Sequence, residues 1–235
     1  MISIIIPTLN EEDNILKTIF RIKKLFLKIK KNYEIIIVDE KSIDKTVTKV
    51  RNLQDKKIKL IASKKKLGLG YAIYQGIQKS NGEYILLLDA DNSVNNIYLE
   101  KIIKSIQHNK LIIGSRYTKK SKIIGVSKLK IFLSKYINKI ISFLFHLKVN
   151  DSSHSLRVFH KKFKYRITNF NHPIFFWENT IKAKALGYNI CEIPIQFNER
   201  ISGKTKNSFN KLFKNILFAT YSVYKLKMRQ ANEKK

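Results

Sequence analysis

Two carboxylates separated by one small residue form the strongest chemical pattern in the sequence. Asp89, Ala90 and Asp91 follow the apolar run of residues 84–88, which is typical of a buried strand. Their side chains can converge on a hard divalent cation, which then completes its shell with water and substrate phosphates. Such a cation stabilises the negative charge that develops on a leaving nucleoside diphosphate. An ordinary strand-end loop with solvated aspartates is the alternative interpretation.

Asp39 is the second acidic signal, because it directly follows another apolar run, residues 33–38. At a strand end its carboxylate can accept hydrogen bonds from a base or a ribose. It could instead cap a helix that begins near Ser42. If both strands are parallel, Asp39 and Asp89 end at the same edge of one sheet, which favours a shared cleft.

The elements that must position these aspartates alternate between strand and helix. Short apolar runs indicate buried strands, and apolar residues three or four apart indicate helices. The first helix is expected to begin at Asn10 as N-cap, with Glu11, Glu12 and Asp13 in its positive first turn. The expected strands are residues 2–6, 33–38, 58–62, 84–88 and 111–113, and the expected helices are residues 10–30, 42–53, 70–79 and 96–107.

This order predicts an α/β fold with a mostly parallel central sheet flanked by helices. The second half adds amphipathic helices at residues 128–147 and 209–228 and a strand at residues 188–197 that Pro194 interrupts. We expect one domain over residues 1–207, followed by a C-terminal amphipathic helix and basic tail over residues 208–235. Both amphipathic helices could lie in a membrane interface with their lysines toward anionic headgroups, or could pack on the sheet.

The charge of the chain favours an anionic partner. Its 235 residues include 47 basic and 17 acidic side chains, a formal net charge of +30. A lipid surface and a nucleic acid both fit this charge, and so does a general bias toward lysine. A single cysteine fits a reducing compartment such as the cytoplasm. We expect no secretory signal, and no run approaches the roughly 20 apolar residues of a membrane-spanning helix.

Other function classes lack the motifs that they need. Residues 67–70 read Leu-Gly-Leu-Gly, but position 73 is Ile, so the third glycine of a dinucleotide-binding loop is missing. The sequence contains no complete Gly-x-x-x-x-Gly-Lys-Ser/Thr phosphate loop and no nucleic-acid recognition motif. A nicotinamide or flavin enzyme is therefore excluded, and a basic nucleic-acid-binding protein is the least favoured hypothesis.

Several motifs in a fixed order resemble the family-2 glycosyltransferases, and within them the dolichol-phosphate mannose synthase-like group. The resemblance covers about residues 1–207. It rests on residues 4–11 (IIIPTLNE), 38–39 (VD), 67–70 (LGLG), 88–91 (LDAD), 114–117 (GSRY), 151–159 (DSSHSLRVF), 177–178 (WE), 192–195 (EIPI) and 199–206 (ERISGKTK).

The resemblance implies a GT-A fold, inversion at the anomeric carbon, Mg²⁺ or Mn²⁺, and a GDP- or UDP-hexose donor. It also implies the roles of individual residues. The nucleotide contacts would be Pro7, Thr8, Asn10, Glu11, Asp39 and Gly68; the catalytic acid and metal ligands Asp89, Asp91 and Ser93; and the phosphate-binding residues Arg116, Arg157 and Arg200, with Ser202 and Lys204 in a mobile loop over the site.

The sequence departs from the family pattern at three places. Glu40 and Lys41 replace an Asp-Gly pair, which concerns the donor contacts. Ser93 stands where the mannose synthases often have a third metal ligand, and a hydroxyl is a weaker ligand. His154 and Leu156 replace small or aromatic residues, so the acceptor pocket is expected to differ.

The acceptor decides whether a base is needed. A lipid monophosphate is already anionic near neutral pH, since its second pKa is about 6, and it requires positioning and cations. A sugar hydroxyl would require a carboxylate base, for which Glu178 is the candidate; core packing of Trp177 and Glu178 is the alternative. The favoured hypothesis is a hexose transferase acting on a polyprenyl phosphate, peripheral on the cytoplasmic face of a membrane, and a family-2 enzyme acting on a sugar hydroxyl is the second.

Overall fold

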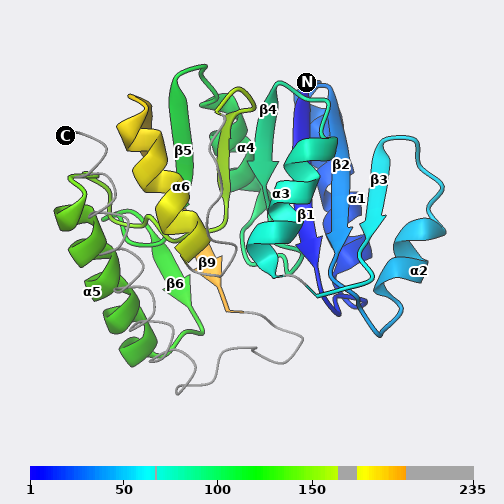
Figure 1. The fold of residues 1–235 in the computed structure, drawn as a ribbon. Coiled ribbons are helices and arrows are strands. Elements are labelled where there is room, and N and C mark those ends of the chain that lie inside the picture. Colours follow the sequence, from blue (N-terminus) through cyan, green and yellow to red (C-terminus); the bar gives the residue numbers. More distant parts are fainter. Residues whose placement is uncertain (67, 164–173, 200–235) are drawn as a thin grey trace.

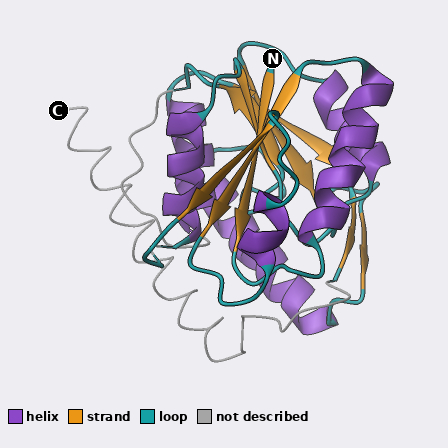
Figure 2. Cartoon of the chain, turned by 90° about the vertical axis from the view of Figure 1, so that its right-hand side faces the viewer, coloured by secondary structure: helices purple, strands orange, loops and turns teal. Residues whose placement is uncertain are grey.

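The protein is built around a seven-stranded sheet with helices on both faces (Figures 1 and 2). The computed structural model describes residues 1–66, 68–163 and 174–199. The expected helix at residues 209–228 and the division at residue 208 lie outside the described residues. Within the described residues, no helix is both long and apolar enough to cross a membrane.

The strand order in the large sheet is β3-β2-β1-β4-β7-β5-β8, and every strand except β7 runs in the same direction. A second sheet contains two parallel strands, β6 and β9. The mostly parallel sheet that the sequence predicts is therefore confirmed. The strands are β1 (Ile2–Thr8), β2 (Tyr33–Asp39), β3 (Ile58–Ala62), β4 (Tyr84–Leu87), β5 (Lys110–Ser115), β6 (Lys122–Ile124), β7 (Arg157–His160), β8 (Asn189–Pro194) and β9 (Gln196–Asn198).

Burial on both faces explains why the first strands are continuous apolar runs. Ile4 and Ile6 of β1 pack in the core cluster that also contains α1 and α4, whereas Ile5 packs in the cluster on the opposite face with α3 and α6. All three side chains are fully buried. A strand covered on one face only would alternate apolar and polar residues. The helices are α1 (Ile15–Ile29), α2 (Thr46–Arg51), α3 (Leu69–Lys79), α4 (Asn96–Lys104), α5 (Lys128–Leu144) and α6 (Ile174–Ala185).

The prediction that the first helix begins at Asn10 is wrong. Helix α1 begins at Ile15 with Asn14 as N-cap, and its first turn contains no acidic residue. Asn10 has a left-handed backbone with φ of 55°, which asparagine tolerates better than most residues. Its amide donates to Ser42 Oγ at 2.8 Å, and its Oδ1 accepts from the Ile43 amide at 2.9 Å. Asn10 therefore ties together the loops after β1 and β2.

Two short strands and one helix were missed, and the predicted strand at residues 188–197 is two strands. Strand β7 is four residues long and starts with an arginine, so it has no apolar run to signal it. Helix α6 is buried on opposite sides, with Phe176 in one core cluster and Trp177 in another, so it lacks a single apolar stripe. The break after Pro194 separates β8 from β9, as the position of that proline indicates.

Candidate active site

The acid loop, which we define as residues 88–94, follows β4 and is fixed against α1. The Thr18 hydroxyl of α1 lies 2.7 Å from the Ala90 carbonyl oxygen and 2.9 Å from Asn92 Oδ1. The Ser93 amide donates a hydrogen bond to Asp91 Oδ1 at 3.1 Å. Ala90 is buried while Asp91 is half-buried. The loop therefore holds its carboxylates at the carboxyl edge of the sheet, where the sequence places them.

Asp89 is linked to a second segment, which we call the serine loop, residues 151–155. The Ser155 hydroxyl donates a hydrogen bond to Asp89 Oδ2. Ser155 lies two residues before β7, so this bond joins the acid loop to the neighbouring antiparallel strand. Sequence reasoning missed Ser155, because a lone serine has no spacing that signals a role. The bond orients the Asp89 carboxylate without cancelling its charge.

Asp39 ends β2 beside Thr8, its partner in the register of β1 and β2. The Thr8 hydroxyl donates to Asp39 Oδ2 at 3.0 Å, and the Ser42 amide donates to Oδ1 at 2.8 Å. Asp39 is 1% exposed. Its carboxylate therefore organises the turn after β2, and it does not cap a helix at Ser42, since α2 begins at Thr46.

The other expected nucleotide contacts lie at the same edge. Pro7 belongs to β1, and Asn10 and Glu11 follow that strand. Gly68 is the N-cap of α3 and has a φ of 99°, a conformation that favours glycine. The strands β1, β2 and β3 point toward this edge in Figure 1, at its lower side. Arg200, Ser202 and Lys204 lie outside the described residues.

Arg116 forms a two-bond ion pair with Asp151 near the acid loop. It follows β5, and its guanidinium contacts Asp151 with two bonds, Nε to Oδ2 at 2.7 Å and Nη2 to Oδ1 at 2.9 Å. Burial alone would raise the pKa of Asp151, but the Arg116 charge and hydrogen bonds outweigh burial and hold that pKa at about 2. Arg116 is also within electrostatic range of Asp89. A cationic group therefore lies near the acid loop.

Arg157 has a different role from the one expected. Its side chain is fully buried, and its guanidinium donates to the carbonyls of Ser152, His154 and Phe176. It also donates to Asn179 Oδ1 at 2.6 Å. This placement does not fit a phosphate-binding residue, because the donors are already used within the protein. Arg157 instead fastens the serine loop to α6.

Glu178 is enclosed within the fold. It lies on α6, is 2% exposed and forms an ion pair of 2.6 Å with Lys182 one turn later. Its neighbour Trp177 packs in the core cluster that α6 shares with α5. The positions of Trp177 and Glu178 therefore fit core packing, the alternative to a catalytic base at Glu178.

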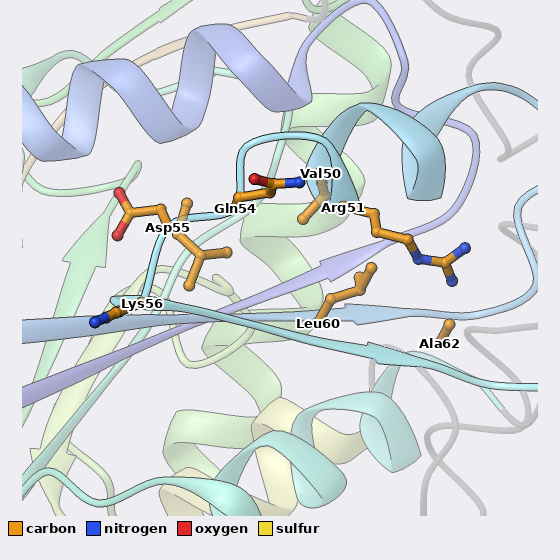
Figure 3. Close-up of a pocket in the computed structure, with 8 residues that line it drawn as sticks. Val50, Arg51, Gln54, Asp55, Lys56, Leu60 and Ala62 are labelled. Carbon is orange, nitrogen blue, oxygen red and sulfur yellow. The ribbon is translucent and has the colours of Figure 1, made fainter.

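A cavity of about 360 Å³ lies away from this edge, between α2 and β3 (Figure 3). Val50 and Arg51 of α2 and Leu60 and Ala62 of β3 are among its lining residues. None of the candidate site residues lines it. The cavity is therefore separate from the candidate active site.

The match to a family model covers residues 3–167 and is described as glycosyl transferase family 2. The chain belongs to this family. A curated relative of this glycosyltransferase is the dolichol-phosphate mannosyltransferase of Pyrococcus furiosus, 29% identical over 221 residues. An uncharacterized glycosyltransferase of Synechocystis sp. is 25% identical over 230 residues. The alignment to the Pyrococcus protein covers 90% of this chain and 60% of that relative, so this glycosyltransferase spans less than two thirds of its length.

Solved structures share the fold of this glycosyltransferase. Glucosyl-3-phosphoglycerate synthase from Mycobacterium tuberculosis, in complex with Mg²⁺ and uridine diphosphate, matches with a TM-score of 0.69 at 15% identity, covering 95% of this chain and 79% of that one. Mannosyl-3-phosphoglycerate synthase from Rubrobacter xylanophilus also matches with a TM-score of 0.69, at 14% identity, covering 99% of this chain and 75% of that one. The expected GT-A fold is therefore confirmed.

Replacing Arg157 with methionine in this glycosyltransferase tests its structural role. The variant leaves several buried carbonyls without a donor, so we expect the free energy of unfolding to fall by about 3 kcal/mol or more. Urea unfolding followed by the fluorescence of the single tryptophan measures this. Arg51→Met, at an exposed arginine, should change stability by less than about 0.5 kcal/mol. Unchanged stability in Arg157→Met, with weaker nucleotide binding, would restore the phosphate-binding role.

The Arg116–Asp151 pair predicts a specific pH dependence of stability. The folded pKa of Asp151 is about 2, below the unfolded value of about 3.9, so the carboxylate stabilises the fold above pH 4 and loses this effect as pH falls toward 2. At pH 7, Asp151→Asn should therefore lower the free energy of unfolding by about 3 kcal/mol relative to the wild type. Urea unfolding measures this difference. The difference should shrink between pH 4 and pH 2.5.

Asp13→Asn is the control for this measurement, because Asp13 is exposed. It should differ little from the wild type at every pH. A stability difference for Asp151→Asn that stays constant as the pH is lowered would contradict the assignment of the charge to Asp151.

Proposed function

We propose that this glycosyltransferase moves a hexose, mannose or glucose, from a nucleotide-sugar donor to a polyprenyl phosphate, with inversion at the anomeric carbon. The proposal is supported by the dolichol-phosphate mannosyltransferase among the relatives and by the convergence of Asp89, Asp91 and Arg116 at one edge of the sheet. The two carboxylates can bind a divalent cation, and the neighbouring arginine can bind phosphate. This combination suits a reaction between two anionic substrates.

The acid loop suits Mg²⁺ or Mn²⁺. Asp89 and Asp91 each take a hydrogen bond from a neutral group, the Ser155 hydroxyl and the Ser93 amide, which orients the carboxylates and preserves their charge. The described residues contain no group of three or more His, Cys, Asp or Glu side chains placed so that together they could hold a metal ion. Two carboxylates therefore suit a cation that keeps water and phosphate ligands, with the Ser93 hydroxyl as a further weak ligand. A bound ion would neutralise charge on the leaving diphosphate.

The protein's own groups would position the acceptor. Arg116 uses Nε and Nη2 for Asp151 and Ser153, and among the described residues its Nη1 makes no hydrogen bond. That nitrogen can bind a phosphate oxygen while Asp151 fixes the plane of the guanidinium. A phosphate monoester with a second pKa of about 6 is already a nucleophile near neutral pH, so holding it in line is the main requirement.

We favour a phosphate acceptor over a sugar hydroxyl because Glu178 is buried and paired with a cation. A hydroxyl must lose a proton to a base within hydrogen-bond reach. Glu178, the carboxylate expected to serve, is buried on α6 and paired with Lys182 at 2.6 Å. A base held by a cation inside the fold is poorly placed to accept that proton.

We also propose that the protein lies peripherally on the cytoplasmic face of a membrane, and the surface of helix α5 supports the membrane contact. Although α5 buries Ile137 and Ile141, Phe132, Tyr136 and Phe143 are 64%, 58% and 78% exposed. A hollow of about 680 Å³ beside α5 is lined by lysines among other residues. Exposed aromatic residues next to lysines suit the boundary between acyl chains and anionic headgroups. The lysines of the hollow are Lys135, Lys139 and Lys148.

A donor screen tests the proposed reaction. Purified protein with Mn²⁺ or Mg²⁺ and a short polyprenyl phosphate should release nucleoside diphosphate from one of GDP-mannose, UDP-glucose or their counterparts, with a lipid-linked sugar as product. Asp91→Ala should lower the rate by about 100-fold or more, because charge on the leaving group is then poorly stabilised. Asp13→Ala should be unaffected. An active Asp91→Ala enzyme would remove the metal assignment.

The same assay separates the two acceptor classes. Glu178→Gln and Lys182→Met both break the ion pair on α6, but only the first removes the carboxylate. For a phosphate acceptor the two variants should retain similar rates. Turnover only with sugar-hydroxyl acceptors, lost in Glu178→Gln and kept in Lys182→Met, would establish Glu178 as a base and overturn the proposal.

Membrane binding can be measured by sedimentation with vesicles that contain phosphatidylglycerol. Replacing Phe132 and Tyr136 together with serine should weaken binding about tenfold. Both rings are exposed in the protein, and partial burial of the two in the lipid would contribute roughly 1 kcal/mol or more to binding. Phe20 and Leu27 of α1 are also exposed, and their double serine variant is the matched control. Equal loss in both double variants would show that α5 is not the contact surface.

A further inference from the structure

His154 is a buried side chain whose polar atoms have no use within the described protein. It lies in the serine loop and is 4% exposed. Neither ring nitrogen has a hydrogen-bond partner among the described residues. Each such buried polar atom costs free energy, and native proteins keep very few of them. An imidazole at this position therefore calls for a partner that the empty protein does not supply.

The other buried histidine among the described residues, His160, shows the usual arrangement. His160 is 3% exposed, at the opposite end of β7. Its Nδ1 accepts from the Lys162 amide at 3.0 Å, and its Nε2 lies 3.2 Å from Glu83 Oε1. His160 is thus satisfied on both nitrogens, whereas His154 is satisfied on neither.

The position of His154 indicates what the missing partner is. Its chain neighbours on the serine loop are Asp151, which holds Arg116, and Ser155, which holds Asp89. Its ring meets the edge of Phe197 with centroids 5.8 Å apart, and Phe197 bridges to Val94 of the acid loop. His154 therefore lies where the acid loop, the serine loop and Arg116 meet.

The charge state of His154 suits an anionic ligand that also binds a cation. Burial, reinforced by the nearby Arg116 guanidinium, lowers the pKa of His154 to about 3, so the ring is neutral at pH 7. A neutral imidazole has one N–H donor and one acceptor nitrogen. It can donate to a phosphate oxygen without placing another cation beside the acid loop.

We propose that His154 donates a hydrogen bond from a ring nitrogen to a phosphate oxygen of a substrate held between the acid loop and Arg116. This inference rests on the proposed function. The phosphate can belong to the diphosphate of the donor or to the monophosphate of the acceptor, which present the same oxygen chemistry. In the empty protein the unsatisfied ring lowers stability, and substrate binding supplies the missing partner.

Binding and melting measurements on His154→Leu test this inference. Titration calorimetry gives the affinity for UDP and for GDP with Mn²⁺, and separately for a short polyprenyl phosphate. Loss of one hydrogen bond to a charged group should weaken binding of the ligand concerned by about tenfold or more. The empty variant should melt at the same or a higher temperature than the wild type, because leucine removes two unsatisfied nitrogens from the interior.

Two further variants complete the test. His154→Gln keeps a donor of similar size and should bind within about threefold of the wild type. His160→Leu removes the satisfied histidine, so it should melt lower and bind nucleotide normally.

Each result has one meaning. Weaker binding confined to UDP or GDP assigns the contact to the donor, and weaker binding confined to polyprenyl phosphate assigns it to the acceptor; both support the inference. Wild-type affinity of His154→Leu for all three ligands overturns the inference and leaves the proposed function intact. A wild-type protein that binds none of the three overturns both.

Discussion

The site depends on the hydrogen bonds that the buried Arg157 guanidinium donates to main-chain carbonyls. By donating to carbonyls of the serine loop and to the Phe176 carbonyl of α6, it gives a segment without regular structure a single conformation. That conformation sets Asp151 against Arg116 and Ser155 against Asp89. Buried carbonyls need donors, and one planar cation with five N–H groups satisfies several at once. The arrangement of charges at the sheet edge follows from this local hydrogen bonding.

The parts of the fold with one dominant physical cause could be predicted from sequence. Strands β1 and β2 are buried on both faces, and such burial leaves a continuous apolar run in the sequence. The placement of Asp39 and Asp89 at one edge then follows from parallel pairing. Strand β7 could not be found in this way, because Arg157 and its length of four residues conceal it. Its antiparallel insertion is what brings the serine loop to the acid loop.

Some of the site residues can be recognised in the sequence, and others only in the structure. The acid pair is visible in sequence because its spacing is itself the signal. The family resemblance implies that Arg157 binds a substrate phosphate, whereas its burial and its contacts with main-chain oxygens give it a structural role. The sequence marks His154 only as a departure from the family pattern, and it gives no sign of the Ser155 bond to Asp89 or of the unsatisfied ring of His154, since both depend on neighbours distant in the chain. Spacing reveals groups that act together within one loop, and tertiary contacts reveal the groups that hold them.

The small sheet of β6 and β9 connects the surroundings of His154 with helix α5. Strand β9 carries Phe197, which contacts His154, and β6 leads through Gly125 into α5, the helix with the exposed aromatic residues. The Glu199 amide donates to the Ile124 carbonyl at 2.8 Å, and a side chain at Gly125 would crowd Glu199. The two strands thus connect the start of α5 with the serine loop. A displacement of the start of α5 would therefore shift β6, and through its pairing with β9 it would also shift Phe197 against His154.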